Sequence, residues 1–322
     1  MACGYLLTIL IPCHSLRYLS LSIESITQQT LPVEKFEVLL VADRVDLVEV
    51  NNILDKSGLN FRVIESTNPG IVPALNLGLA NITSEFVARM DEDDLMMPRR
   101  LELQYQHMLT NKETSVVGGQ LLLIDVDEVV IGVSGYRKRI SKASFHVFES
   151  SPIAHPAAMF RRKAVEQIGG YRDFLPEDWD LWVRLNEYGP IENLTETVLR
   201  YRVHPNQLSR EKMYAQQLGR QFVSVSHFAR MSGIRDAPNE SEDKSVWLEK
   251  TRMKLRLISM EFRQFEKRSE KSNHVVEAFQ SGVRLHRLQK VVSTLLKYPI
   301  VTSTYLIIKI GNKIKLSVNK AK

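Results

Sequence analysis

Short apolar runs alternate with helix-like stretches between residues 6 and 98, and this alternation narrows the possible folds more than any other feature. The apolar runs cover residues 6–12, 36–42, 61–65 and 86–88. Runs of this length are typical of strands buried inside a sheet. A stretch with helical spacing follows each of the first three runs, and this order predicts a Rossmann-like, mostly parallel α/β sheet with helices on both faces.

Four consecutive acids, Asp91 to Asp94, follow the fourth apolar run. Ligands bind outside the carboxyl ends of the strands in open α/β sheets, so we expect this cluster at the ligand-binding edge. Adjacent carboxylates repel one another, and a hard divalent cation with oxygen ligands would relieve the repulsion. A solvated acidic turn is the alternative interpretation. A calcium loop of the EF-hand type is excluded, because its sixth position requires glycine and Met96 stands there.

Residues typical of helix starts, together with further apolar runs, extend the prediction of helices and strands along the chain. Ser15 is expected to cap the first helix, and Pro98 to open the helix that follows the acids. Residues 116–125 and 129–133 are expected to pair as strands. Trp179 and Trp182 have helical spacing, which favours core positions.

The positive charge is concentrated at the end of the chain. Residues 236–322 hold 18 of the 43 Lys and Arg residues but only 9 of the 37 acids. We therefore expect one domain over residues 1–235 and a basic helical extension over 236–322, which either contacts an anionic membrane surface or packs on protein. Residues 1–235 carry more acids than bases, so a nucleic-acid-binding function is not expected. No stretch of eighteen apolar residues predicts a transmembrane helix.

Several motifs follow one another in a fixed order. They are Asn68-x-Gly70 before Ala74-Leu75-Asn76, Arg89-Met90-Asp91-Glu92-Asp93-Asp94, Pro98-Arg99-Arg100-Leu101 with Gln104, His155-Pro156, Gly169-Gly170-Tyr171, Glu177-Asp178-Trp179 and Tyr201-Arg202-Val203-His204. In this order and spacing, roughly the first two-thirds of the chain resembles family 2 of the inverting glycosyltransferases, which have the GT-A fold. The Q-x-x-R-W motif of processive polysaccharide synthases is absent from the sequence, so the resemblance favours the transfer of single sugars.

The resemblance implies a nucleotide-sugar donor, a divalent metal and inversion at the anomeric carbon. Asp91 and Asp93 match the D-x-D motif, with Asp93 as a metal ligand and Asp91 on the donor side. His204 aligns with a late histidine that lies near the metal or the diphosphate, and a structural histidine is the alternative. The expected metal is Mn²⁺ or Mg²⁺, both of which prefer oxygen-rich sites.

The resemblance also places Pro12, Asp43, Asn76 and Arg89 at donor-binding positions. Asp43 matches the aspartate that contacts the base or ribose, although the family usually has paired acids followed by Gly-Ser at this point. The alternative for Asn76 is a brace for the loop after the fourth strand. The alternative for Arg89 is that it neutralises the four acids Asp91 to Asp94, the acidic loop, and not a phosphate.

On the acceptor side, Asp178 matches the catalytic base of the family's Glu-Asp motif, and we expect Glu177 and His155 nearby. Inversion needs a base opposite the leaving group, where it takes the proton of the acceptor hydroxyl. The alternative for Asp178 is an acid of a first helical turn, favoured by the helix dipole. The alternative for His155 is a simple turn residue.

The expected function is therefore that of a metal-dependent inverting glycosyltransferase. Its expected donor is a UDP-sugar, and its acceptor a saccharide or lipid-linked saccharide in surface-glycan synthesis. We expect it in the cytoplasm or bound peripherally to the inner face of the membrane. A catalytically silent sugar-nucleotide-binding or scaffold protein is the alternative, against which the intact Asp91, Asp93 and Asp178 argue. The sequence leaves the oligomeric state open.

Overall fold

The computed structural model describes residues 5–142, 144, 151–173 and 176–204, with scattered residues between 223 and 254. The chain divides into two compact units, Met1–Arg220 and Gln221–Lys322. Most of the expected basic extension, residues 236–322, lies outside the described residues. None of the helices within the described ranges combines the length and apolarity of a membrane-spanning segment.

The first half of unit one is a parallel sheet, as the sequence predicts. Its strands lie in the order β3-β2-β1-β4 and pair in parallel. The strands are β1 (Leu7–Cys13), β2 (Phe36–Ala42), β3 (Phe61–Glu65) and β4 (Phe86–Arg89). Every residue of β1, β2 and β4 is buried, which explains why these runs are mostly apolar.

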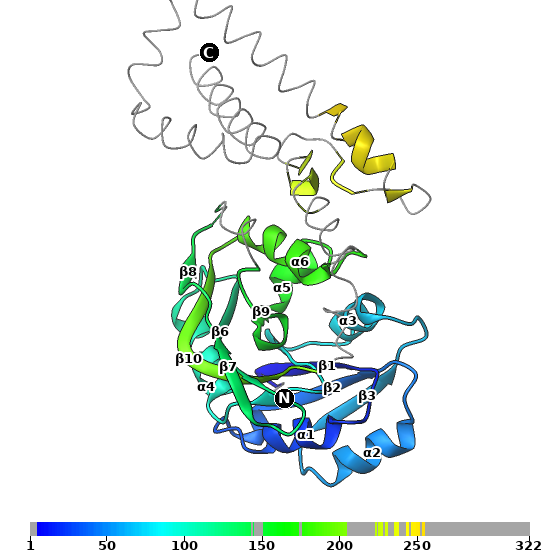
Figure 1. The fold of residues 1–322 in the computed structure, drawn as a ribbon, viewed down its shortest axis with the longest axis vertical. Coiled ribbons are helices and arrows are strands. Elements are labelled where there is room, and N and C mark those ends of the chain that lie inside the picture. Colours follow the sequence, from blue (N-terminus) through cyan, green and yellow to red (C-terminus); the bar gives the residue numbers. More distant parts are fainter. Residues whose placement is uncertain are drawn as a thin grey trace, which may run out of the picture. The chain divides into compact units, whose positions relative to one another are not determined.

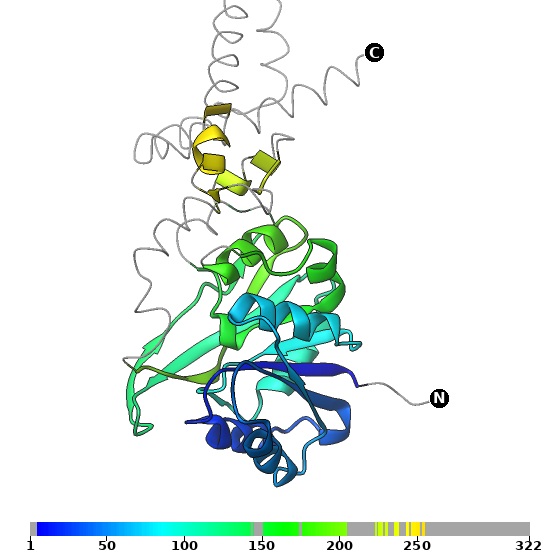
Figure 2. The same ribbon diagram turned by 90° about the vertical axis from the view of Figure 1, so that its right-hand side faces the viewer.

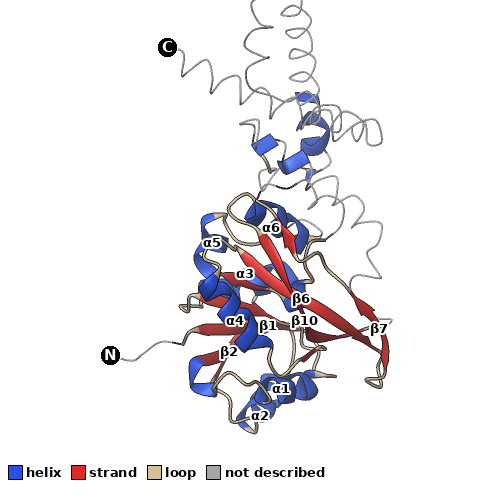
Figure 3. Ribbon diagram, turned by 90° about the vertical axis from the view of Figure 1, so that its left-hand side faces the viewer, coloured by secondary structure: helices blue, strands red, loops and turns tan. Residues whose placement is uncertain are grey.

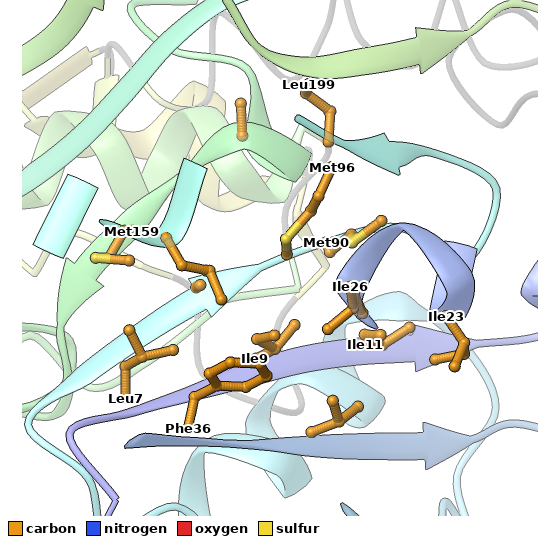
Figure 4. Packing of buried hydrophobic residues seen from close by; sticks show 14 of the residues in the cluster. Leu7, Ile9, Ile11, Ile23, Ile26, Phe36, Met90, Met96, Met159 and Leu199 are labelled. Atoms are coloured by element: carbon orange, nitrogen blue, oxygen red, sulfur yellow. The ribbon is translucent and has the colours of Figure 1, made fainter. Parts of the chain in front are cut away.

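Helices cover both faces of these strands (Figure 1). They are α1 (Leu19–Thr27), α2 (Leu47–Asp55) and α3 (Ile71–Ala80). The helix α3 packs closely on β1 and β2, since a Cβ added at Gly78 would lie 2.3 Å from Leu10 Cδ1. On the other face, Ile9 and Ile11 of β1 pack against Ile23 and Ile26 of α1 (Figure 4). Full burial of each such side chain contributes about 1.5–3 kcal/mol.

The second half adds antiparallel strands to the same sheet. Its elements are β5 (Leu95–Met96), α4 (Arg100–Thr110), β6 (Val116–Ile124), β7 (Val130–Ser134), β8 (Arg139–Ile140), β9 (Met159–Arg161), α5 (Arg162–Gln167), α6 (Glu177–Asn186) and β10 (Ile191–Arg202). The strand β9 lies antiparallel between β4 and β6, and β10 runs parallel to β6. The sheet therefore continues past β4 in the order β4-β9-β6-β10-β5.

The expected pairing of residues 116–125 with 129–133 is confirmed as the antiparallel hairpin of β6 and β7. Figures 2 and 3 show this hairpin reaching past the other strands of the sheet. Trp179 and Trp182 are both buried in α6, as expected from their spacing.

Two helix starts differ from the prediction. Helix α1 begins at Leu19 after Tyr18, and the hydroxyl of Ser15 accepts a hydrogen bond from Arg17 N in a preceding turn, so Ser15 is not the cap. Helix α4 begins at Arg100 and not at Pro98. The reason is β5, because its pairing with β10 keeps the chain extended until after residue 96.

Candidate active site

The four acids leave the carboxyl end of β4, at the edge where parallel strands place ligands. Carboxylate oxygens of Asp91, Asp93 and Asp94 all lie within 4.8 Å of one another. Burial, aided by repulsion from Asp93 and Glu92, raises the pKa of Asp91 to about 6 although Arg89 opposes the shift. This crowding of carboxylates is the arrangement that a divalent cation stabilises.

Asp94 is a member of this cluster that the D-x-D pattern does not single out. Its side chain is fully buried, and Oδ1 accepts a hydrogen bond of 2.9 Å from Arg202 N. Its Oδ2 is buried without a hydrogen-bond partner. Burial and the repulsion of Asp93 and Asp91 raise the pKa of Asp94 well above its usual range. The only signal in the sequence is its position as the fourth acid of the run.

The end of β10 supports the acidic loop from the other side. His204 Nε2 lies 2.9 Å from Asp93 Oδ2, so two residues that the sequence resemblance assigns to the metal are neighbours. Arg202 is fully buried, and its Nε donates to the carbonyl of Asp93 at 2.9 Å. Its Nη1 donates to the carbonyls of Asp125 and Val126 in the turn between β6 and β7. Arg202 therefore fixes the loop to the hairpin.

The end of β1 reaches the same loop through His14. Its Nδ1 lies 2.6 Å from Glu92 Oε1, and its backbone N–H also donates to that oxygen. The hydrogen bond to Glu92 raises the pKa of His14 to about 9, assisted by the charges of Asp91 and Asp93. His14 therefore presents an imidazolium beside the acids, a contact that no spacing in the sequence predicts.

Asp43 lies at the end of β2, on the same edge of the sheet. Its Oδ2 accepts a hydrogen bond of 2.8 Å from Gly70 N, and Arg44 Nε donates to Oδ1 at 2.9 Å. Burial works to raise the pKa of Asp43, but the Gly70 N–H and the Arg44 guanidinium outweigh burial and hold it below its usual value. Pro12 is buried within β1, where it lies beside Val41.

Arg89 is buried beside the acids. Its Nη2 lies 2.5 Å from Asp91 Oδ1, while Nε and Nη1 are buried without a hydrogen-bond partner. Burial alone would lower the pKa of Arg89, but the charge of Asp91 raises it above its ordinary value, so the guanidinium stays protonated. The same guanidinium acts on the pKa of Glu177 and of Asp178. Arg89 therefore interacts electrostatically with acids of both the D-x-D and the Glu-Asp motif.

The Glu-Asp pair occupies the first turn of α6, where the N-terminal end of a helix favours negative charge. Asp178 Oδ1 accepts a hydrogen bond of 2.8 Å from Trp179 N. Burial raises the pKa of both carboxyls, that of Glu177 to about 7 with the help of Asp178. Carboxyls with raised pKa values are suited to proton transfer near neutral pH.

His155 and Asn76 are both engaged within the protein. His155 is buried, its Nε2 lies 2.8 Å from Tyr171 Oη, and its Nδ1 lies 3.7 Å from Glu177 Oε1. Burial and the charge of Arg89 hold the pKa of His155 well below its usual value, so the ring is neutral. Asn76 donates to the carbonyl of Tyr171 and accepts from its N–H, both at 2.9 Å. These contacts brace the segment between α5 and α6 and not the loop after β4, and the donor contact of Asn76 stays a prediction.

Comparison with known proteins identifies the family. The model of glycosyl transferase family 2 matches residues 8–169. The chain belongs to this family. The O-antigen biosynthesis glycosyltransferase WbnJ of Escherichia coli is 35% identical over 195 residues, which are 58% of this chain and 75% of WbnJ. An E. coli UDP-Gal:alpha-D-GlcNAc-diphosphoundecaprenol beta-1,3-galactosyltransferase is 28% identical over 174 residues, 52% of this chain and 62% of the relative.

Solved structures confirm the fold of this family 2 glycosyltransferase as GT-A. S. aureus TarS 1–349 in complex with UDP-GlcNAc superposes with a TM-score of 0.52 at 16% identity, over 74% of this chain and 68% of TarS. The mannosyltransferase PcManGT of Pyrobaculum calidifontis, in complex with GDP-Man and Mn²⁺, gives a TM-score of 0.51 at 15% identity. That match covers 96% of this chain and 88% of PcManGT.

Proposed function

We propose that this glycosyltransferase moves one sugar from a UDP-sugar to a saccharide or lipid-linked saccharide, with inversion, in the synthesis of a surface polysaccharide. The observation that carries the proposal is the buried Arg89, which pairs with Asp91 and acts electrostatically on Glu177 and Asp178. The names of WbnJ and of the galactosyltransferase support the polysaccharide context and a lipid-linked acceptor. The UDP-GlcNAc in TarS supports a UDP-sugar donor.

The residues at the end of β4 fit a divalent metal. The buried and unpartnered Oδ2 of Asp94 lies in a set of carboxylate oxygens, which are the ligands that Mn²⁺ and Mg²⁺ prefer. We assign the metal to Asp93 and His204, beside Asp91 on the donor side. When bound, the cation would stabilise negative charge on the diphosphate leaving group. The Mn²⁺ in PcManGT supports a divalent metal in this fold.

We assign proton transfer and nucleoside binding to residues of the chain itself. Asp178 takes the proton of the acceptor hydroxyl, and the N–H of Trp179 holds one of its oxygens in place. Arg89 limits how far burial raises the pKa of Glu177 and Asp178, because a nearby cation favours the charged form. At the other end of the site, Asp43 holds the nucleoside, and its carboxylate is oriented by Gly70 N and Arg44. Pro12 and Asn76 complete the donor side.

A thermal-shift panel tests the donor and the metal together. The full chain is heated with UDP, GDP, dTDP or CMP, each with and without Mn²⁺. A ligand that binds only the folded state stabilises it by about 2.7 kcal/mol at a hundredfold excess over Kd. We expect a shift with UDP that requires Mn²⁺. In a separate assay we expect a UDP-sugar to release UDP when acceptor is added, because the sugar passes to the acceptor. Binding without turnover of any UDP-sugar in the presence of lipid-linked acceptors would instead favour a catalytically silent protein.

We also propose that the chain works at the cytoplasmic face of the membrane, held there by its basic extension. After Glu277 the sequence has nine Lys and Arg residues and no acid. Such segments bind anionic lipid, and salt weakens the binding. Deleting the residues after Ala278 should abolish cosedimentation with anionic vesicles and leave UDP binding unchanged. Cosedimentation that persists in the deletion variant would contradict this role of the extension.

A further inference from the structure

Arg44 has an uncommon backbone conformation just after β2. Its φ is 59°, in the left-handed region that residues with a Cβ disfavour. Among the described residues other than glycine, Glu128 shares this property with a φ of 65°. Glu128 lies in the turn between β6 and β7, and hairpin turns favour positive φ. Arg44 lies outside any hairpin, between β2 and α2, so its conformation points to a function for the side chain.

The side chain of Arg44 extends into solvent beside a buried carboxylate. It is 73% exposed, and its Nε donates to Asp43 Oδ1 at 2.9 Å. An ion pair with so exposed an arginine adds little to stability, so this contact alone does not explain why arginine stands here. Within the part of the chain that the structure describes, Nη1 and Nη2 of Arg44 have no protein partner. The guanidinium therefore keeps N–H donors for a ligand.

Arg44 also borders the proposed donor site. The backbone N–H of Asp43 donates to the carbonyl of Cys13 at 2.8 Å, which joins the ends of β2 and β1. The next residue of the β1 end, His14, lies 2.6 Å from Glu92 of the acidic loop. The guanidinium of Arg44 is therefore on the nucleoside side of an edge that continues directly to the acids.

We propose that Arg44 is a specificity-determining residue, whose guanidinium donates to a ring carbonyl of the donor's base while Asp43 accepts from the neighbouring ring N–H. The inference rests on the proposed UDP-sugar donor. A carboxylate accepts and a guanidinium donates, so side by side they match a base in which N–H and C=O adjoin. Uracil has its N3–H between two carbonyls and fits on either side. Cytosine has an unprotonated N3 at this position, and it would face the Asp43 carboxylate as a second acceptor.

Sulfur-substituted nucleotides test the contact atom by atom, because sulfur accepts hydrogen bonds more weakly than oxygen. The full chain is titrated calorimetrically with UDP, 2-thio-UDP or 4-thio-UDP in the presence of Mn²⁺. The wild type should bind one of the two analogues roughly threefold to tenfold more weakly than UDP. Arg44→Gly should bind UDP roughly tenfold more weakly than the wild type, and should bind that analogue as well as it binds UDP.

Control variants separate this contact from other effects. Glycine and asparagine both tolerate positive φ, so Arg44→Gly and Arg44→Asn should fold, which thermal unfolding checks, and should lose UDP affinity alike. Arg44→Lys keeps the charge but not the planar fork of donors, and should also bind UDP weakly. The matched control is Arg62→Gln, since Arg62 pairs with the buried Glu37 at the other end of β2. This variant should bind UDP as the wild type does.

Three results would overturn the inference while leaving the UDP-sugar proposal in place. The first is unchanged UDP affinity in Arg44→Gly or Arg44→Lys, the latter meaning that charge alone matters. The second is a wild type that binds UDP and both analogues equally. The third is weak UDP binding by Arg44→Gly with an undiminished sulfur effect, which would limit Arg44 to orienting Asp43. A wild type that binds no UDP overturns the donor assignment and this inference together.

Discussion

The guanidinium of Arg89 lies 2.5 Å from Asp91 Oδ1 while its Nε and Nη1 remain buried without a hydrogen-bond partner. A buried charge is retained only where other charges balance it, and here the balance comes from carboxyls of two separate motifs. Repulsion from Asp91 also contributes to the raised pKa of Glu177. The charge state of the acidic loop and that of the Glu177–Asp178 pair are therefore connected through one side chain.

The first prediction separates the base from the metal site. Asp178→Asn keeps the side-chain volume but cannot accept a proton, so transfer should fall by about 10²–10⁴-fold while the affinity for donor and metal stays near that of the wild type. Asp93→Asn is the matched comparison and should weaken metal-dependent donor binding as well as turnover. Isothermal titration with UDP and Mn²⁺, together with a transfer assay, measures both effects. Asparagine is also a good helix cap, so near-normal transfer by Asp178→Asn would reduce Asp178 to a capping residue.

The second prediction concerns pH. Burial raises the pKa of Glu177 to about 7 and also raises that of Asp178, so transfer should increase with pH as the pair loses its proton. Glu177→Gln removes the neighbouring negative charge, and the rising limb should move to lower pH. The same raised pKa values mean that the folded state binds the extra proton more tightly than the unfolded chain. The pair's contribution to stability should therefore decline as pH rises from about 4.5 to about 7.

Initial rates at saturating donor and fixed Mn²⁺ measure this profile between pH 5 and 9. If the rising part of the pH–rate profile lies at the same pH in Glu177→Gln as in the wild type, another group controls the rate.

The third prediction concerns His14, whose pKa is raised to about 9 by its hydrogen bond to Glu92. A cation with a raised pKa stabilises the fold fully below its ordinary value of 6.5 and loses this effect as pH rises through about 9. His14→Asn should therefore lower the melting temperature at pH 6 and have little effect near pH 9.5. The loss should stay below about 1 kcal/mol, because the His14 side chain is 59% exposed.

Calorimetry at the two pH values measures this difference. In a Glu92→Gln background the effect of the substitution at position 14 should differ less between the two pH values, because only the charges of Asp91 and Asp93 then raise the pKa of His14. A pH dependence that is undiminished without Glu92 would contradict the role given to this hydrogen bond.

The fourth prediction concerns Arg202, which donates to three backbone carbonyls from a fully buried position. Arg202→Met should cost at least about 2–3 kcal/mol, since it removes hydrogen bonds from a charged donor and leaves buried acceptors unpaired. It should also weaken Mn²⁺-dependent UDP binding, because the carbonyl of Asp93 is no longer held.

Arg17→Met is the matched control, since both arginines lie over the ring of Tyr18, at 5.0 Å for Arg17 and 4.3 Å for Arg202. Arg17 is exposed, so its loss should cost less than about 1 kcal/mol. Equal losses in urea unfolding would contradict the role given to the buried hydrogen bonds.

The sequence predicted the parallel half of the sheet closely. The expected strands over residues 36–42 and 61–65 coincide with β2 and β3. The mostly apolar run of β2 is typical of a buried strand, whereas β3 lies at the end of the strand order and is only partly buried. It also located the acidic loop at the end of β4. The two-residue strand β5 carries too few side chains to leave a periodic signal, and its pairing with β10 delays α4. The pairing of β9 with β4 and β6 continues the sheet beyond β4, and no pattern within these strands encodes that pairing.

The sequence predicted those site residues that the family resemblance identifies. It predicted less well which residues far apart in the sequence contact one another. The neighbours Asp93 and His204 are 111 residues apart, and only the resemblance connected them in advance. Nothing local indicates that His14 meets Glu92, or that Asp94 accepts a hydrogen bond from Arg202 N 108 residues away. Such contacts depend on how strands line up across the sheet, which side-chain patterns within one segment do not encode.

The late position of β9 in the chain has a consequence for synthesis on the ribosome. β4 ends at Arg89, yet the strand that pairs with its free edge, β9, ends only at Arg161. At about 5–20 residues per second, roughly 4–14 s separate the two. During that interval the nascent chain presents an apolar strand with unpaired backbone groups beside an uncompensated acidic loop. Rare codons placed between these strands should therefore lower the soluble yield more than the same codons placed after residue 161.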